Sequence, residues 1–303
     1  MSGELFRNNE SVVGDNQSVA VVEIEKSMDK VIQTLCPEYF CVTRENVTYG
    51  IREGVTYYSE TTKCERRANV LLPSDYDSSK KYPVLYFLHG IFGDENSMLG
   101  EEANKLDIIC GNLKADKHIG DVIIVFPNMF ATGDPNIQPG FNSEQTAPYD
   151  NFINDLINDL IPFIEKKYSV ISDREHRGLI GFSMGGRETL FIGLMRSDVI
   201  GSFCAISSAP GLVPSQDNFM KHDGQFKNEA DMCLKTDMKP DMIMVCCGTQ
   251  DSVVGQFPAN YHRILTENEI EHLWFEVPGA DHNSDAIRSG YYNFLIRWNG
   301  IKA

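Results

Sequence analysis

One serine stands in a short glycine-rich motif that is suited to nucleophilic catalysis. Ser183 is the middle residue of the stretch 181–185, Gly-Phe-Ser-Met-Gly, which matches the pattern G-x-S-x-G. An apolar run precedes the motif and residues 187–195 have helical spacing, so a strand, a sharp turn and a helix are predicted. Glycines two positions either side of the serine let the strand and helix approach closely while the serine takes strained dihedral angles. We therefore predict that Ser183 is a nucleophile presented above the edge of a sheet.

A serine nucleophile needs a general base and an acid that orients the base, and both follow later predicted strands. Asp251 comes just after the apolar run 242–248, and His282 follows the predicted strand 272–277. Asp241 precedes its strand, on the wrong side of the sheet, so Asp251 is the favoured acid. The chain order Ser183, Asp251, His282 is that of the α/β-hydrolase catalytic triad.

Acyl transfer also needs backbone N–H groups that stabilise the negative charge on the carbonyl oxygen. Met184, the residue after the nucleophile, is predicted to supply one of them. The loop 89–93, His-Gly-Ile-Phe-Gly, follows an earlier buried strand and offers the N–H of Ile91 as the second. We expect His89 to orient this loop rather than to take part in catalysis.

Strands and helices alternate along the chain in the way that an open α/β sheet requires. Runs rich in Val, Thr and Tyr between residues 42 and 72 predict an antiparallel pair at the sheet edge. An amphipathic helix is predicted over 149–168, with a kink at Pro162, and a final helix over 285–298. Continuous apolar runs predict parallel strands buried on both faces at 82–93, 122–127, 178–182, 203–208 and 242–248. We predict an α/β-hydrolase fold, with a central mostly parallel sheet, helices on both faces and an antiparallel N-terminal edge.

Length and patterning indicate one catalytic domain over residues 36–303, preceded by an arm at 1–35 that is partly disordered or helical. Two loop insertions are expected, near 128–148 and 209–241. The first leaves the carboxyl end of a strand, where ligands bind in such sheets, so it is a candidate substrate loop. The second is a candidate for a small lid.

Composition disfavours several classes of partner. The formal net charge of −16 would repel nucleic acids and anionic membranes. The chain contains no run of 18 apolar residues and does not start like a signal peptide, so we expect a cytoplasmic protein unless a signal has been removed. The eight cysteines lack the spacing of a zinc site and are expected to be buried thiols, although Cys36 and Cys41 are close enough for a small disulfide loop.

With these motifs the chain resembles the esterase D-like branch of the α/β hydrolases and, within it, the feruloyl esterases of carbohydrate esterase family one. The resemblance rests on the serine motif with its following Gly186, the block 174–177 (Arg-Glu-His-Arg), the loop 89–93 and the stretch 279–298. It implies a serine esterase that needs no metal or organic cofactor and releases ferulate or p-coumarate from plant cell-wall xylan through an acyl-enzyme. The expected partner is a small-molecule or polysaccharide-linked ester.

Three loop aromatics are candidates for the slot that would hold a hydroxycinnamoyl ring: Phe92, Phe130 and Phe141. The same family includes acetylxylan esterases and S-formylglutathione hydrolases, which stay open as alternatives. An inactive hydrolase fold that serves as a binding protein is a third, although the intact Ser183, Asp251 and His282 argue against it.

Overall fold

An eight-stranded sheet organises the described part of the chain. The computed structural model describes residues 31–100, 102–216 and 221–302. The strands lie in the order β1-β2-β4-β3-β5-β6-β9-β10, and all neighbours are parallel except β1 with β2 and β2 with β4. Their bounds are β1 (Ile51–Ser59), β2 (Cys64–Leu72), β3 (Val84–Leu88), β4 (Ile123–Pro127), β5 (Arg177–Phe182), β6 (Ser202–Ile206), β9 (Met242–Gly248) and β10 (Leu273–Val277). The predicted mostly parallel sheet with an antiparallel N-terminal edge is confirmed.

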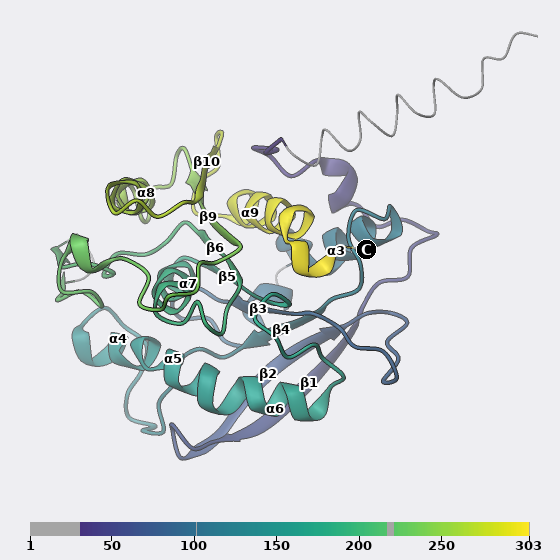
Figure 1. Cartoon of the computed structure of the whole chain (residues 1–303), viewed down its shortest axis with the longest axis horizontal. Coiled ribbons are helices and arrows are strands. Elements are labelled where there is room, and N and C mark those ends of the chain that lie inside the picture. Colours follow the sequence, from purple (N-terminus) through teal and green to yellow (C-terminus); the bar gives the residue numbers. More distant parts are fainter. Residues whose placement is uncertain (1–30, 101, 217–220, 303) are drawn as a thin grey trace, which may run out of the picture. The chain divides into compact units, whose positions relative to one another are not determined.

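Helices cover both faces of this sheet. Figure 1 shows α3 and α9 on one face, and α4, α5, α6, α7 and α8 on the other. The helices are α2 (Ser97–Gly100), α3 (Leu106–Ala115), α4 (Ser143–Asp150), α5 (Phe152–Asp155), α6 (Ile161–Lys167), α7 (Met184–Met195), α8 (Phe257–Glu267) and α9 (Ser284–Arg297). Short 3-10 turns add η1 (Glu38–Cys41), η2 (Glu102–Asn104), η4 (Glu229–Asp231) and η5 (Asn299–Ile301). The architecture is the predicted α/β-hydrolase fold.

The core forms because the central strands are apolar on both sides. Every residue of β3, β4 and β6 is buried, as expected for strands covered by helices on two faces. Toward α9, the ring of Phe87 lies 5.9 Å from Phe126 and 5.6 Å from Tyr291, centroid to centroid. In the edge strand β1, buried residues alternate with exposed ones over its second half, because only one of its faces is covered.

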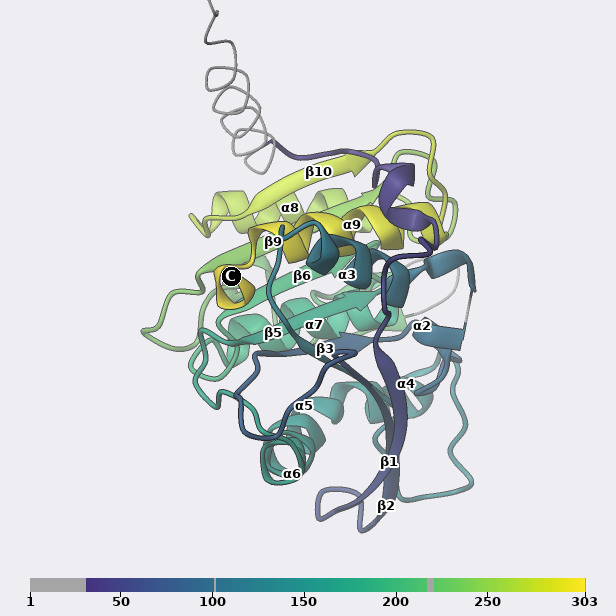
Figure 2. The same cartoon turned by 90° about the vertical axis from the view of Figure 1, so that its right-hand side faces the viewer.

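The sheet twists strongly from β1 and β2 to β10, as Figure 2 shows. Strands β3, β5, β9 and β10 run parallel, so the loops that follow them leave from the same edge of the sheet. That edge therefore gathers the loop 89–93, Ser183, Asp251 and His282 from four distant parts of the sequence. The fold supplies the convergence that the catalytic prediction requires.

Two expected loops contain more regular structure than the sequence analysis allowed. Residues 143–150 of the first insertion form α4, whose start is fixed by a capping box between Asn142 and Gln145. The second insertion contains a two-stranded hairpin of β7 (Ser215–Gln216) and β8 (Lys221–His222). Both were missed because short polar elements carry little hydrophobic periodicity.

The predicted kink at Pro162 takes a different form. The residues before it make a π-helical turn, η3 (Leu156–Leu160), in which the N–H of Ile161 bonds to the carbonyl of Leu156. A proline ring clashes with the carbonyl four residues earlier, and widening the preceding turn relieves that clash. The helix therefore continues through Pro162 as α6.

Several predictions concern residues at the margins of the structure. The predicted arm at 1–35 lies almost entirely outside the described residues.

All eight cysteines are free, and the sulfur atoms of Cys36 and Cys41 lie 3.5 Å apart without a bond. Within the described ranges, no helix has the length and apolar character needed to cross a membrane.

A buried ion pair ties the antiparallel edge to the helical layer. Arg66 of β2 donates from Nε to Asp155 of α5 at 3.0 Å, and the Tyr57 hydroxyl donates to the same carboxylate oxygen at 2.6 Å. The two charged side chains are only 5% and 0% exposed. Arg66 also donates to the backbone carbonyls of Phe130 and Asn128, so it holds the start of the first insertion.

Replacing Arg66 with methionine should therefore lower the free energy of unfolding by about 3–5 kcal/mol, since Asp155 would stay buried without its partner. Urea unfolding of the purified variant measures this change. The double variant Arg66→Met/Asp155→Leu should regain much of the stability. Arg67→Met, at the exposed next position of the same strand, is the control and should change it by no more than about 0.5 kcal/mol. A similar loss in both single variants would contradict the role of the ion pair.

Candidate active site

The serine motif forms the predicted sharp turn between β5 and α7. Ser183 has φ 58° and ψ −116°, a strained conformation for a residue other than glycine. Its N–H donates to the carbonyl of Ile206 at 2.9 Å, and its own carbonyl accepts from Ala209 at 2.9 Å and Arg187 at 3.0 Å. These backbone hydrogen bonds hold the strained residue in place.

The glycines of the motif are required by close contact. A Cβ added to Gly181 would lie 2.2 Å from the carbonyl oxygen of Gly185. A Cβ added to Gly185 would lie 2.5 Å from the carbonyl oxygen of Leu88. Both distances are shorter than any tolerated contact, so the sequence pattern reflects the packing of β5 and β3 against the helix.

Asp251 and His282 meet as predicted, each just beyond the end of its strand. His282 Nδ1 lies 3.0 Å from Asp251 Oδ2, and the N–H groups of Val253 and Val254 donate to the other carboxylate oxygen at 3.1 and 3.0 Å. Burial raises the pKa of Asp251, but the hydrogen bond and charge of His282 outweigh it, so the pKa lies below its usual value. The carboxylate is therefore ionised at neutral pH and accepts the Nδ1 proton, which leaves Nε2 of the imidazole as the basic nitrogen.

Phe182 packs against the imidazole of His282. Its ring lies 4.4 Å from the ring of His282, centroid to centroid, and it directly precedes Ser183. No hydrogen bond joins Ser183 to His282 among the interactions of the described residues. Such contacts are often long before substrate binds, so the arrangement is compatible with a triad.

The loop 89–93 lies against the serine. A Cβ added to Gly90 would be 3.4 Å from the Cβ of Ser183. The Phe92 N–H is already donated to the Tyr149 hydroxyl at 3.2 Å, which favours the preceding Ile91 N–H as the oxyanion donor of this loop. Met184 begins α7, where the first N–H groups of a helix have no partner within the helix. The two predicted donors therefore flank Ser183.

His89 is buried and orients this loop, as the sequence analysis expected. The N–H of Met129 donates to His89 Nε2 at 3.0 Å, so the ring proton is on Nδ1 and is donated to the Gly90 carbonyl at 2.6 Å. Burial lowers the pKa of His89 to about 4. The imidazole is neutral at physiological pH and has no free nitrogen for catalysis.

An apolar cavity of about 210 Å³ opens beside the serine. Its walls include the predicted Phe92 and Phe141, whose ring centroids are 5.4 Å apart in an edge-to-face arrangement. The remaining wall comes from residues that the sequence analysis missed: Ala209, Pro210, Val253 and Val254, besides Ile91 and Met184. A planar aromatic group is the kind of ligand that such a slot favours.

Phe130 does not belong to this cavity, so its prediction as a ring contact is wrong. Its ring packs edge-to-face on Tyr149 at 5.0 Å between centroids, and it lines a separate polar cavity. The reason is the Arg66 guanidinium, which binds the Phe130 carbonyl at 2.8 Å and fixes the loop away from Ser183.

A buried charged network behind the nucleophile was not foreseen. Arg187 and Glu188, both fully buried at the start of α7, are bonded to each other at 2.6 Å. Arg187 also pairs with Asp150 of α4, and Gln225 donates to Glu188 at 2.9 Å. Burial raises the pKa of Glu188 to about 7 despite the neighbouring arginine. The network holds the second insertion, which supplies Ala209 to the cavity, against α7. The sequence signal for this network is a charged pair, Arg187 and Glu188, inside an otherwise apolar helix.

The site contains no evident metal centre. Within the described part of the chain, no cluster of three or more His, Cys, Asp or Glu side chains is arranged to hold a metal ion.

Comparisons with known proteins identify related esterases. The sequence matches the family described as "Putative esterase" over residues 59–289. It is 34% identical over 173 residues to the endo-1,4-beta-xylanase/feruloyl esterase of Xylanibacter ruminicola, a match that covers 55% of this chain and 23% of that protein's length.

Solved structures give the longer alignment. A CE1 ferulic acid esterase from Anaeromyces mucronatus, in complex with ferulic acid, is 44% identical and superposes with a TM-score of 0.85 over 89% of this chain and 98% of that chain. An S-formylglutathione hydrolase from Staphylococcus aureus is 17% identical with a TM-score of 0.61, over 84% of this chain and 100% of that chain, and shares the fold.

The geometry at Asp251 predicts that Asp251→Asn reduces kcat for ester substrates far more than it raises KM. Asparagine occupies the same space but favours the wrong imidazole tautomer, which lowered turnover roughly 10⁴-fold in one well-studied triad. Steady-state kinetics on a soluble ester measures the effect. Asp241→Asn, at the opposite end of β9, is the control and should be mild. The reverse order of severity would show that the acid has been misassigned.

Burial of neutral His89 predicts a pH-dependent stability. Its pKa is about 4 in the folded state and about 6.5 when unfolded, so the unfolded chain binds more protons between these values and stability falls as pH drops. The loss attributable to this residue is up to about 3 kcal/mol from pH 7 to pH 4. Denaturant unfolding across this range should show a shallower fall for His89→Gln than for the wild type. Parallel curves would contradict the assignment.

Proposed function

Since the chain belongs to the esterase family matched over residues 59–289, we propose that it is a feruloyl esterase that releases hydroxycinnamate from arabinose side chains of xylan. It is a carboxylic ester hydrolase of the α/β-hydrolase fold. The observation that carries the choice of acyl group is the apolar cavity beside Ser183, whose two facing aromatic rings suit a flat phenolic ring. The 44% identity to a ferulic acid esterase supports the same choice.

In the proposed mechanism, Ser183 Oγ attacks the ester carbonyl carbon while His282 Nε2 removes its proton. The bond between that carbon and the sugar oxygen then breaks, and His282 returns the proton to the departing oxygen. Asp251 holds the imidazole in the required tautomer and stabilises the imidazolium ion. A water molecule, deprotonated by His282, then attacks the acyl carbon. The bond between that carbon and Ser183 Oγ breaks, His282 returns the proton to Oγ, and the carboxylic acid leaves.

Negative charge on the carbonyl oxygen grows in both steps. The N–H groups of Met184 and Ile91 are the proposed donors, since they flank the serine from the helix and from the neighbouring loop. Three backbone hydrogen bonds hold the strained backbone of Ser183 in place before substrate arrives. The N–H of the next residue, Met184, is therefore positioned in advance for the oxyanion.

The alternatives have less support. An acetyl group would fill only a small part of the apolar slot walled by Phe92 and Phe141 and would bury little apolar surface there. The likeness to an S-formylglutathione hydrolase concerns the fold alone. A non-catalytic binding role leaves the hydrogen-bonded Asp251 and His282 without a purpose.

The acyl preference is tested with methyl ferulate, methyl p-coumarate and p-nitrophenyl acetate. Catalytic efficiency, corrected for the better leaving group of the last, should be higher on the two aromatic esters, because burying a ring contributes more than burying a methyl group at about 25 cal/mol per Å². Ser183→Ala, which lacks the proposed nucleophile, is the negative control and should hydrolyse none of the three esters. Equal or better corrected efficiency on acetate would reject feruloyl specificity.

Two aromatic variants test whether the preference for aromatic esters arises at Phe141. Phe141→Ala should reduce the ratio of ferulate to acetate efficiency by roughly 2–10-fold, which corresponds to about 0.5–1.5 kcal/mol for an aromatic pair. Tyr58→Ala, at an exposed aromatic of the distant edge strand, is the matched control. The same ratio in both variants would place the acyl ring elsewhere.

A further inference from the structure

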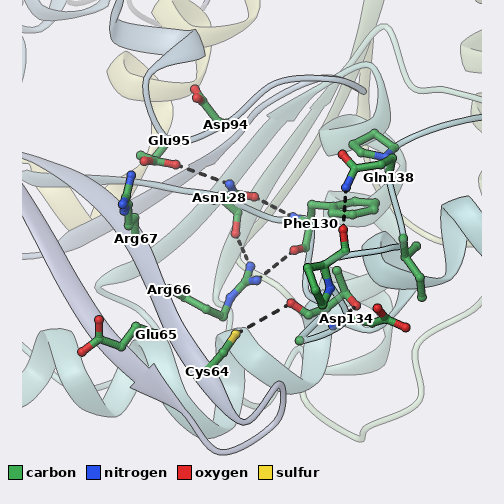
Figure 3. A pocket seen from close by; sticks show the side chains of 15 residues that line it. Cys64, Glu65, Arg66, Arg67, Asp94, Glu95, Asn128, Phe130, Asp134 and Gln138 are labelled. Carbon is green, nitrogen blue, oxygen red and sulfur yellow. Dashed lines mark hydrogen bonds between the residues drawn. The ribbon is translucent and has the colours of Figure 1, made fainter.

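A second cavity, larger and polar, is lined by residues of two loops that also line the apolar one. Its volume is about 520 Å³, within the range of about 300–1,000 Å³ of small-ligand sites. Figure 3 shows that the start of β2 and the loops after β3 and β4 surround it. The catalytic mechanism gives this cavity no role.

The cavity presents a buried carboxylate that lacks a strong partner. Glu95 is 8% exposed, and among the described residues its side chain forms one hydrogen bond, a long one of 3.4 Å from Asn128 Nδ2. Figure 3 shows these two side chains pointing toward each other at the cavity wall. A buried carboxylate ordinarily has several donors or a cation, so Glu95 has unused accepting capacity.

The neighbouring groups combine donors, acceptors and an apolar surface. Arg67 lines the cavity and makes no ion pair or side-chain hydrogen bond with any residue that the structure describes. Gln138 adds an exposed amide, and the Phe130 ring adds a flat apolar surface. Arg66 is not available, because it is committed to Asp155 and to two backbone carbonyls.

The charged, polar and apolar groups that line the cavity favour one class of ligand over the others. An anion is disfavoured, because Glu65, Asp94, Glu95 and Asp134 all line the cavity with only one uncommitted arginine. A metal ion is disfavoured, since these carboxylates form no metal-binding cluster within the described ranges. An apolar ligand would leave Glu95 unsatisfied. A neutral molecule with many hydroxyl groups satisfies the donors and the acceptors together.

The same two loops supply residues to both cavities. Phe92 lines the apolar cavity and Asp94 the polar one, two residues further along the same loop. The first insertion repeats this pattern, with Pro139 in the polar cavity and Phe141 in the apolar one. Tyr149 joins them, because it accepts from the Phe92 N–H and packs on Phe130.

We propose that the polar cavity binds the saccharide part of the ester, with Glu95 and Arg67 as hydrogen-bonding residues, while the apolar cavity holds the acyl ring. This inference rests on the proposed function, since it concerns the alcohol side of the same substrate. The ester bond joins the acyl group to the sugar, so a polar cavity served by the same two loops as the acyl cavity has the polarity that the sugar requires.

The test compares a substrate that has the sugar with one that lacks it. The variants Glu95→Gln and Arg67→Ala, and the wild type, are assayed on a feruloylated arabinoxylo-oligosaccharide and on methyl ferulate. The ratio of kcat/KM on the oligosaccharide to that on methyl ferulate should fall roughly tenfold in each variant, the usual effect of one lost hydrogen bond. Thermal unfolding verifies that both variants are folded.

The matched control is Glu271→Gln, which removes a charge from another polar cavity at the amino end of β9. Its ratio should equal that of the wild type. An unchanged ratio in Glu95→Gln and Arg67→Ala, with methyl ferulate still hydrolysed, would overturn the saccharide site and leave the proposed function standing.

A calorimetric titration separates the two hypotheses. Unesterified arabinoxylo-oligosaccharide should bind the wild-type chain and bind Glu95→Gln more weakly, whether or not any ester is hydrolysed. If the wild type fails on methyl ferulate, the proposed function is wrong and this titration alone decides the saccharide site. Absence of oligosaccharide binding to the wild type would overturn it.

Discussion

The close approach of β5, β3 and α7 around Ser183 is the constraint on which the rest of the structure depends. The backbone of Gly185 passes so near Gly181 and Leu88 that no side chain fits at either glycine. This contact accompanies the strained conformation of Ser183, which is held by a hydrogen bond from its N–H to the Ile206 carbonyl and by one from the Ala209 N–H to its own carbonyl. Such strain persists only where the surroundings over-determine the backbone, so the buried sheet is a condition of the chemistry.

Buried polar groups fix the parts of the site that the sheet does not reach. Arg187 and Glu188 anchor the second insertion from behind the nucleophile, while Arg66 and Asp155 anchor the first from the sheet edge. His89 locks the loop that faces Ser183. Loops lack regular backbone hydrogen bonding, and these side chains supply the hydrogen bonds that hold each loop in one arrangement.

The division between an apolar and a polar cavity follows from these anchors. The first insertion is held so that Phe141 borders the serine while Phe130 turns to the other side. Both are phenylalanines in the same polar segment, so nothing local distinguishes them. The distinction arises because Arg66, more than sixty residues earlier in the chain, binds the carbonyl of Phe130.

Sequence patterns were enough to predict the eight strands of the main sheet, the serine turn, the pairing of Asp251 with His282 and the structural role of His89. These follow from local rules: apolar runs make buried strands, and residues just past parallel strands meet at one edge. The tertiary structure decided the shape of the insertions, the membership of the two cavities and the buried Arg187–Glu188 network. The physical reason is that these features depend on contacts between side chains far apart in the chain, whose energies leave no periodic mark on the sequence.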